Sequence, residues 1–168
     1  MKGMLKTSIL GAAAAILLST SASTAGEITI GMAPNLQTLP IVVAMSEGYF
    51  DEEKIQLKTV KFTSGRRALE ALIGGQLDVA FMAEYPVSIA SLRKQPFGTF
   101  TTLSRYTANR MISKASIGFK DPSSLSGKKI GTTKGSNTEF FTEALIEKFK
   151  IDAEVINVSP PDIVPALA

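Results

Sequence analysis

The sequence of 168 residues contains no cysteine, no histidine and no tryptophan. Without cysteine the chain cannot form a disulfide, a thiolate nucleophile, an iron–sulfur cluster or a cysteine-ligated zinc site. Without histidine it lacks the commonest general base and the commonest transition-metal ligand, so most hydrolytic triads are impossible. The composition favours binding over catalysis, although a carboxylate, lysine or tyrosine acting alone would still permit an enzyme.

Hydrophobic residues make up 45% of the chain and charged residues 20%. Both values are close to the globular average, so we expect a folded protein rather than a disordered one.

Residues 1–25 have the pattern of a secretory signal peptide. Lys2 and Lys6 precede an apolar run at 9–18, and small residues surround Ala25. A membrane anchor is the alternative, but ten apolar residues fall short of the roughly 20 that a membrane-crossing helix needs. We predict cleavage near Ala25 and a periplasmic or otherwise exported protein.

The net charge is small once this segment is removed. Loss of Lys2 and Lys6 lowers the formal net charge from +3 to +1. A nearly neutral protein lacks the basic surface on which nucleic-acid binding depends, so we expect no nucleic-acid partner.

The remaining chain alternates between strand and helix patterns. Strands are predicted over 27–32, 55–62, 78–82, 97–103, 109–114, 128–133 and 153–158, and helices over 40–47, 65–73, 86–92, 136–149 and from 163 onward. Strands separated by helices imply parallel sheets with right-handed crossovers, and therefore an α/β fold.

A break in this pattern at 104–108 predicts two α/β units, over 26–105 and 106–168. The second unit has two or three predicted strands, fewer than the usual four to six. No glycine or polar cap closes the helix that begins near residue 163. We therefore expect the chain to be the N-terminal part of a longer protein.

Four loops that follow predicted strands are candidate binding positions, because ligands of open parallel sheets bind beyond the carboxyl ends of the strands. The candidate ligand-binding residues are Asn35 and Gln37 in the first loop, Ser64 and Gly65 in the second, Glu84 and Tyr85 in the third, and Gly135, Ser136 and Asn137 in the fourth.

The second loop has both a structural and a functional interpretation. Ser64 is a good N-cap for the helix that follows. Arg66 and Arg67 then lie in the first turn, where the helix dipole disfavours cations. A bound anion would offset this cost, and so would solvent exposure or a pair with Glu70.

The third and fourth loops also leave alternatives open. Glu84 suits a ligand ammonium group or a solvated helix start, and Tyr85 offers a flat wall with a hydroxyl. Ser136 and Glu139 match the S-x-x-E capping box, which satisfies two amides. The other first-turn amides remain available to an oxyanion, and Gly135 permits close approach of the backbone to a ligand.

The sequence lacks the common nucleotide and metal motifs. There is no G-x-G-x-x-G, residues 126–129 (SGKK) do not form a Walker A loop, and acids and amides are too scattered for a calcium loop. We expect no cofactor and no metal site.

Several segments, in this order, resemble one group of transport proteins: 44–50 (AMSEGYF), 63–65 (TSG), 71–80 (ALIGGQLDVA), 125–131 (LSGKKIG) and 134–136 (KGS). The chain resembles the solute-binding proteins of ABC importers, in the NMT1/THI5-like or SsuA-like branch that serves nitrate, aliphatic sulfonates, taurine and thiamine precursors. The resemblance covers residues 28–168.

This resemblance implies a type II periplasmic-binding-protein-like fold, with lobe one nearly complete but lacking its C-terminal return, and lobe two only begun. Two such lobes close over a small ligand. Ser64 and Gly65 from one lobe and Gly135 and Ser136 from the other are the implied contacts.

The resemblance also implies a function. The protein would be a monomer that captures a small organic or inorganic oxyanion-type solute outside the membrane and delivers it to a membrane permease with its cytoplasmic ATPase. The alternative is an exported sensor module, or a truncated relic of the same fold that no longer binds.

One enzymatic relative is disfavoured. The eukaryotic THI5-type enzyme resembles this group in fold but depends on an active-site histidine and a cysteine-rich motif. This sequence has neither residue type, so we expect no enzymatic activity.

Overall fold

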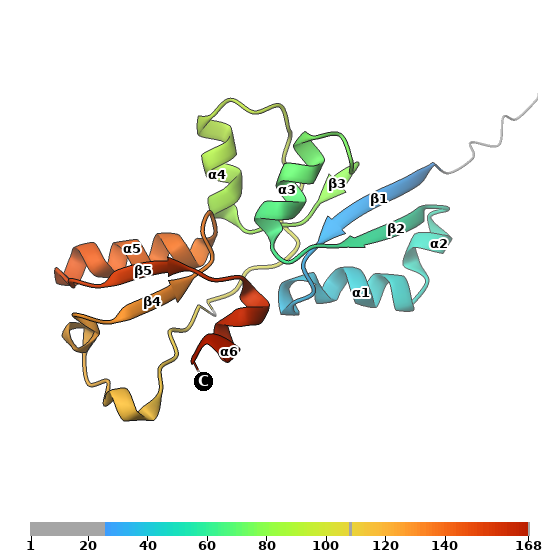
Figure 1. Ribbon diagram of the computed structural model, residues 1–168. Coiled ribbons are helices and arrows are strands. Elements are labelled where there is room, and N and C mark those ends of the chain that lie inside the picture. Colours follow the sequence, from blue (N-terminus) through green and yellow to red (C-terminus); the bar gives the residue numbers. More distant parts are fainter. Residues whose placement is uncertain (1–25, 108, 168) are drawn as a thin grey trace, which may run out of the picture.

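The computed structural model describes residues 26–107 and 109–167 (Figure 1). The predicted signal peptide and its cleavage site lie outside the described residues. The described chain forms two parallel β-sheets, each with its own helices. We call residues 27–92 the N-terminal unit and residues 122–167 the C-terminal unit. Figure 1 shows them side by side, joined by a long segment with little regular structure.

The N-terminal unit is built on a parallel sheet with the strand order β2-β1-β3. Its strands are β1 (Glu27–Met32), β2 (Gln56–Lys61) and β3 (Val79–Ala80), and its helices are η1 (Leu36–Thr38), α1 (Leu39–Ser46), α2 (Tyr49–Glu52), α3 (Gly65–Ile73) and α4 (Glu84–Leu92). Glu27 pairs with Gln56 and Ile30 with Val79, so β1 is the central strand. The prediction of a parallel α/β sheet is confirmed.

The core of this unit lies against the central strand. Ile30, Met32 and Ile41 are buried together. Partly buried side chains pack around them: Phe50, Leu57, Val79, Phe81 and Leu103. Helix α3 buries Ala68, Leu69 and Ala71. Its charged residues Arg67 and Glu70 are exposed and Arg66 is half-buried, as the amphipathic sequence broadly predicts.

The C-terminal unit is built on two parallel strands. It contains η3 (Pro122–Leu125), β4 (Lys129–Thr132), α5 (Asn137–Phe149), β5 (Glu154–Asn157), η4 (Pro160–Asp162) and α6 (Ile163–Leu167). Leu125, Ile130 and Ile151 form its small core, against which Leu145 and Ile146 of α5 pack. The strands β4 and β5, helix α5 and the start of α6 lie within one residue of their predicted positions, whereas η3 and η4 were not predicted as helices.

Two predicted strands are wrong. Residues 97–103 and 109–114 have no strand structure, and the next element after α4 is the short helix η2 (Ala115–Ile117). A strand needs a partner of matching length, and β3 next to this segment pairs over only two residues. β3 is also shorter than the predicted 78–82 and only half-buried, and α4 begins two residues earlier than predicted.

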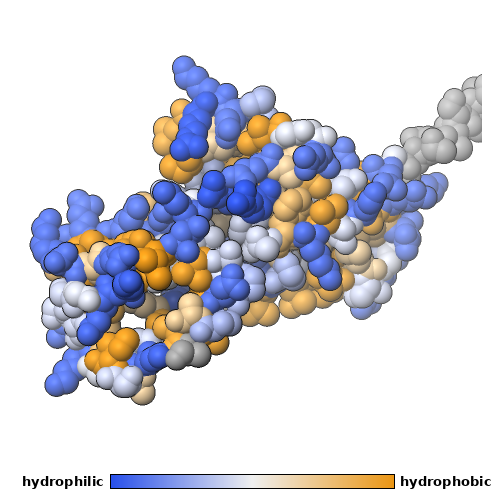
Figure 2. Space-filling model, in the orientation of Figure 1, coloured by the Kyte–Doolittle hydropathy of each residue, from blue (hydrophilic) through white to orange (hydrophobic). Residues whose placement is uncertain are grey.

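Large hydrophobic side chains are exposed in both units. They include Leu36, Leu39 and Val42 near α1, and Phe140 and Phe141 on α5. Figure 2 shows hydrophobic surface over both units, including the region of α5 and β5. No helix among the described residues has the length and apolar character that a membrane crossing requires.

Candidate functional site

The four predicted loops all follow parallel strands. The loops after β1, β2 and β3 share one edge of the N-terminal sheet, because these strands run in the same direction and pair. The fourth loop follows β4, and contacts between α4 and α5 bring it to the same region. The loops of both units therefore converge.

In the first loop Asn35 has a structural function. Its Oδ1 accepts hydrogen bonds from the backbone N–H of Gln37 at 3.0 Å and of Thr38 at 3.2 Å, which caps η1. Oγ1 of Thr38 in turn accepts a hydrogen bond from the N–H of Asn35 at 3.3 Å. Gln37 is half-buried, and its carbonyl oxygen accepts a hydrogen bond from Ser104.

In the second loop Ser64 caps α3, as predicted. Its Oγ accepts from the N–H of Arg67 at 3.4 Å. Glu70 forms ion pairs with Arg66 at 2.9 Å and with Arg67 at 3.0 Å. This carboxylate offsets the unfavourable position of two cations in a first helical turn, so the arginines need no bound anion.

Gly65 is required by packing at the start of α3. A Cβ at this position would lie 2.8 Å from Cβ and 2.9 Å from Cα of Met82. The helix start therefore lies directly on the chain that leaves β3. Gly65 has a structural reason to be glycine, whether or not it contacts a ligand.

In the fourth loop the predicted capping box is wrong in its geometry. The Ser136 Oγ does not cap α5 but donates to the carbonyl oxygen of Thr133 at 2.6 Å. The Glu139 carboxylate accepts from the N–H of Gly135 at 2.6 Å. Gly135 has φ of 75°, in the left-handed region that favours glycine.

The predicted close approach at Gly135 involves a side chain of the other unit. A Cβ on Gly135 would lie 2.5 Å from Cδ of Arg66. The guanidinium Nη1 of Arg66 donates to the carbonyl oxygen of Lys134 at 3.2 Å. The start of α3 and the loop before α5 are therefore in direct contact.

Three of the predicted residues bind one another across the two units. Oδ1 of Asn137 accepts from the N–H of Tyr85 at 2.9 Å, and its Nδ2 donates to Oε2 of Glu84 at 2.7 Å. The ring of Tyr85 lies 5.5 Å from the ring of Phe140, centroid to centroid. The structure brings together the third loop, in the N-terminal unit, and the fourth loop, in the C-terminal unit.

Glu84 is held in its charged form. Its own backbone N–H lowers the pKa of the carboxyl group, and the amide of Asn137 lowers it further, while partial burial opposes both. Nearby Tyr106 has a raised pKa, first because of burial and second because of the charge on Glu84. A negative charge therefore lies where the two units meet.

This charge predicts how acid affects stability. Because the pKa of Glu84 is lower in the folded chain than its ordinary value of 4.5, its contribution is present above that value and is lost as the pH falls through the folded pKa. An exposed carboxylate at a helix start contributes about 0.3–1 kcal/mol. Thermal unfolding from about pH 7 to about pH 3 should therefore show a smaller loss of stability for Glu84→Gln than for the unchanged chain.

Glu53→Gln, at the end of α2 and away from this contact, is the matched control for that measurement. Parallel pH curves for Glu84→Gln and the unchanged chain would contradict the assignment of this charge.

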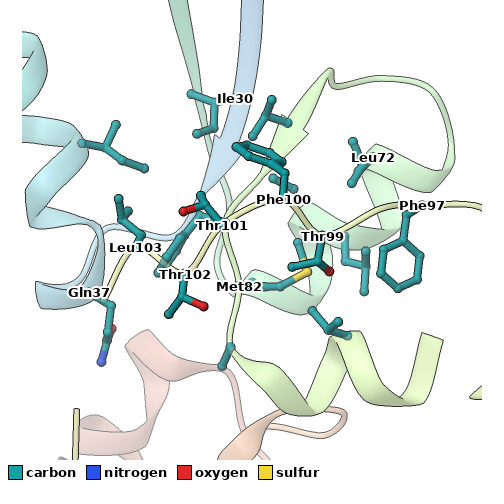
Figure 3. A pocket seen from close by; sticks show the side chains of 18 of the residues that line it. Ile30, Gln37, Leu72, Met82, Phe97, Thr99, Phe100, Thr101, Thr102 and Leu103 are labelled. Atoms are coloured by element: carbon teal, nitrogen blue, oxygen red, sulfur yellow. The ribbon is translucent and has the colours of Figure 1, made fainter. Parts of the chain in front are cut away.

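An apolar pocket of about 840 Å³ lies in the N-terminal unit. Figure 3 shows the segment from Phe97 to Leu103 crossing it, with Gln37 and Leu72 at opposite ends. Four of the predicted residues line this pocket: Asn35, Gln37, Gly65 and Glu84. The other five are not part of its lining: Ser64, Tyr85, Gly135, Ser136 and Asn137.

Two features of this region were not predicted from the sequence: the position of Tyr106 and the contact of Arg66 with the other unit. Tyr106 lines the pocket within the segment interpreted as a boundary, and no sequence pattern marks it. Arg66 joins the two units, and its only sequence signal is a cation in a first helical turn. Among the described residues no group of three acidic side chains is placed to hold a metal ion.

Comparison with known proteins identifies the family. The model of the family described as NMT1/THI5 like matches residues 35–167. A Bacillus subtilis (strain 168) protein, provisionally named an aliphatic sulfonates-binding protein, is 30% identical over 66% of this chain and 34% of its own length. The taurine-binding periplasmic protein of Escherichia coli (strain K12) is 24% identical over 83% of this chain and 44% of its own length.

A solved structure supports the fold. The alkanesulfonate-binding protein SsuA from Xanthomonas axonopodis pv. citri, bound to MOPS, aligns with a TM-score of 0.64 at 17% identity. The alignment covers 86% of this chain and 52% of that one. The chain thus spans about a third to a half of the length of the proteins that it matches. It has part of the SsuA-like periplasmic-binding fold, and it belongs to the NMT1/THI5-like family.

Proposed function

We propose that this chain belongs to the extracytoplasmic solute-binding component of an ABC importer and captures a small oxyanion-type solute between its two units. The observation that carries the proposal is the meeting of two helix starts from different units. Arg66 at the start of α3 lies against Gly135 in the loop before α5. Helix starts present backbone N–H groups and favour negative charge.

The proposed contacts are the nine residues of the four loops. Ser64, Gly65, Gly135 and Ser136 are the best placed to meet an oxyanion, because they flank the two helix starts. Asn35, Gln37, Glu84, Tyr85 and Asn137 would complete the site around them. The names of the relatives support a sulfonate, since one includes aliphatic sulfonates and another taurine.

Glu84 favours one kind of solute within this class. A carboxylate held in its charged form repels an anion but attracts an ammonium group. An aminosulfonate such as taurine carries both a sulfonate for the helix starts and an ammonium for Glu84. We therefore rank taurine above nitrate and above thiamine precursors.

The other parts of the proposal follow from this role. The signal segment would be removed near Ala25 and the protein would act in the periplasm or another exported location as a monomer. Its partners would be the solute and a membrane permease with its ATPase, and it would catalyse no reaction. Lobe one would comprise residues 26–105 and lobe two would begin with 106–168.

Titration calorimetry of the full chain tests the proposal with a matched pair of solutes. Taurine and ethanesulfonate share the sulfonate and differ mainly in the ammonium group. We expect taurine to bind at least about tenfold more tightly, and Glu84→Gln to remove most of that difference, because a hydrogen bond to a charged group contributes about 1.5–3 kcal/mol.

Nitrate and a thiamine-precursor pyrimidine complete the panel. Binding of ethanesulfonate and taurine with equal affinity would contradict the function of Glu84 but keep the oxyanion site. Absence of binding by every solute would overturn the proposed function and favour the non-binding relic.

A further inference from the structure

The two units are joined by side chains rather than by shared secondary structure. Their sheets are separate, and no strand pairing links them among the described residues. Between α4 and η3, the described part of the connecting segment contains no regular element other than η2. The relative position of the units must therefore depend on contacts between side chains and loops.

Asn137 makes the most specific of these contacts. Its carboxamide bonds two consecutive residues in the first turn of α4, accepting from the N–H of Tyr85 and donating to the carboxylate of Glu84. The partners have opposite polarity, one a donor and one an acceptor. They fix the orientation of the amide, because a flipped amide would lose both bonds.

Arg66 makes a second contact across the same boundary. Its guanidinium donates to the carbonyl oxygen of Lys134 at 3.2 Å and remains paired with Glu70 of its own helix. Glu70 thereby holds the arginine in position to reach the other unit. A Cβ at position 135 would lie 2.5 Å from Cδ of Arg66 and would force this side chain to move.

We propose that Asn137 and Arg66 form a two-point clasp that holds the two units together before any solute is bound. The clasp does not depend on the identity of the solute. It would hold the two helix starts close together in advance. A solute that binds between them would then lose less binding free energy to the closure of the two units.

The absence of cysteine makes a direct test possible. A cysteine pair at Lys61 on β2 and Glu143 on α5 would carry the only two spin labels in the chain, both at exposed positions on regular elements. Pulsed electron paramagnetic resonance of the full chain without solute then measures the distance between the units. We expect one narrow distance population.

The clasp variant combines Asn137→Ala with Arg66→Ala, and we expect its distance distribution to broaden towards longer values. The control combines Gln95→Ala with Arg67→Ala. Gln95 is exposed in the segment after α4, and Arg67 pairs with Glu70 within its own helix. The control should keep the narrow distribution. Circular dichroism of each variant checks that both units remain folded.

A second pair of variants tests the clasp by adding, and then removing, a repulsive charge at the contact between Asn137 and Glu84. Asn137→Asp places a carboxylate against Glu84 and should broaden the distribution through repulsion. Adding Glu84→Gln restores a donor and an acceptor and should narrow it again. A broad distribution in the unchanged chain, a narrow one in the folded clasp variant, or failure of Glu84→Gln to restore closure would each overturn the proposal.

Discussion

Replacing Gly65 with alanine is expected to destabilise the N-terminal unit by about 1–3 kcal/mol, the usual cost of overpacking a close contact. The new Cβ would meet Cβ and Cα of Met82 at 2.8 and 2.9 Å. A backbone atom cannot rotate away as the end of a side chain can, so α3 or the chain after β3 must move. The melting temperature should fall by roughly 2–4 °C for each kcal/mol.

Gly98→Ala is the matched control, because a Cβ at Gly98 would have no atom within 4 Å and its φ is not in the left-handed region. Thermal unfolding of the two variants beside the unchanged chain gives the comparison. If Gly65→Ala melts at the same temperature as Gly98→Ala, the close contact between α3 and Met82 is wrong.

Replacing Ser136 with alanine is expected to weaken solute binding by about tenfold or more, the effect of losing a hydrogen bond to a charged group. The Ser136 hydroxyl does not cap α5, and the contact at the helix start comes from Glu139 instead. The hydroxyl donates to the carbonyl oxygen of Thr133 and lies within hydrogen-bond distance of Oγ1 of Thr138, so its loss should cost about 0.5–1.5 kcal/mol of stability for each bond lost. Thermal unfolding beside the calorimetry separates this loss of stability from the loss of affinity.

Substitutions at the neighbouring positions have structural effects of their own. Ser64→Ala should weaken binding as well, but it also removes the cap of α3, worth about 0.5–2 kcal/mol. Any side chain at Gly135 would be strained by its φ of 75° and would collide with Arg66. Ser91→Ala, at an exposed position on α4, is the control. Calorimetry should show its affinity unchanged and that of Ser136→Ala reduced, and equal affinities would remove Ser136 from the site.

Features that depend on a few neighbouring residues could be predicted from the sequence. The alternating pattern of β2 locates the strand within a residue at each end, and Ser64 caps α3 as expected. Gly48 ends α1 with φ of 77°. Each depends on side-chain periodicity or backbone preference within one turn or strand, which the sequence records directly.

Features that depend on a partner could not be predicted in the same way. Residues 97–103 have a strand-like composition, but β3 offers only two residues for pairing, so the segment crosses the pocket without strand structure. Ser136 and Glu139 have the spacing of a capping box, yet the hydroxyl turns to the carbonyl of Thr133. The spacing permits this hydrogen bond as readily as the cap.

The candidate site likewise has features that could be predicted from the sequence and features that could not. Parallel strands place their following loops at one edge, so the convergence of the loops after β1, β2 and β3 follows from the strand order of their sheet. The approach of the fourth loop, which belongs to the other sheet, does not follow from it. The bond between Asn137 and Tyr85 joins residues 52 positions apart, and the sequence contains no sign of it. The contact of Arg66 with Lys134 could not be predicted for the same reason: the two residues lie far apart in the sequence and in different units.

The most direct test of a solute site shared by the two units is a nuclear magnetic resonance titration of the isotope-labelled full chain with the tightest-binding solute of the calorimetric panel. We predict the largest backbone amide shifts at Ser64 and Gly65 in one unit and at Gly135 and Ser136 in the other, with all four saturating at the same solute concentration. Shifts confined to one unit, or to the segment 97–103 that crosses the apolar pocket, would contradict this prediction.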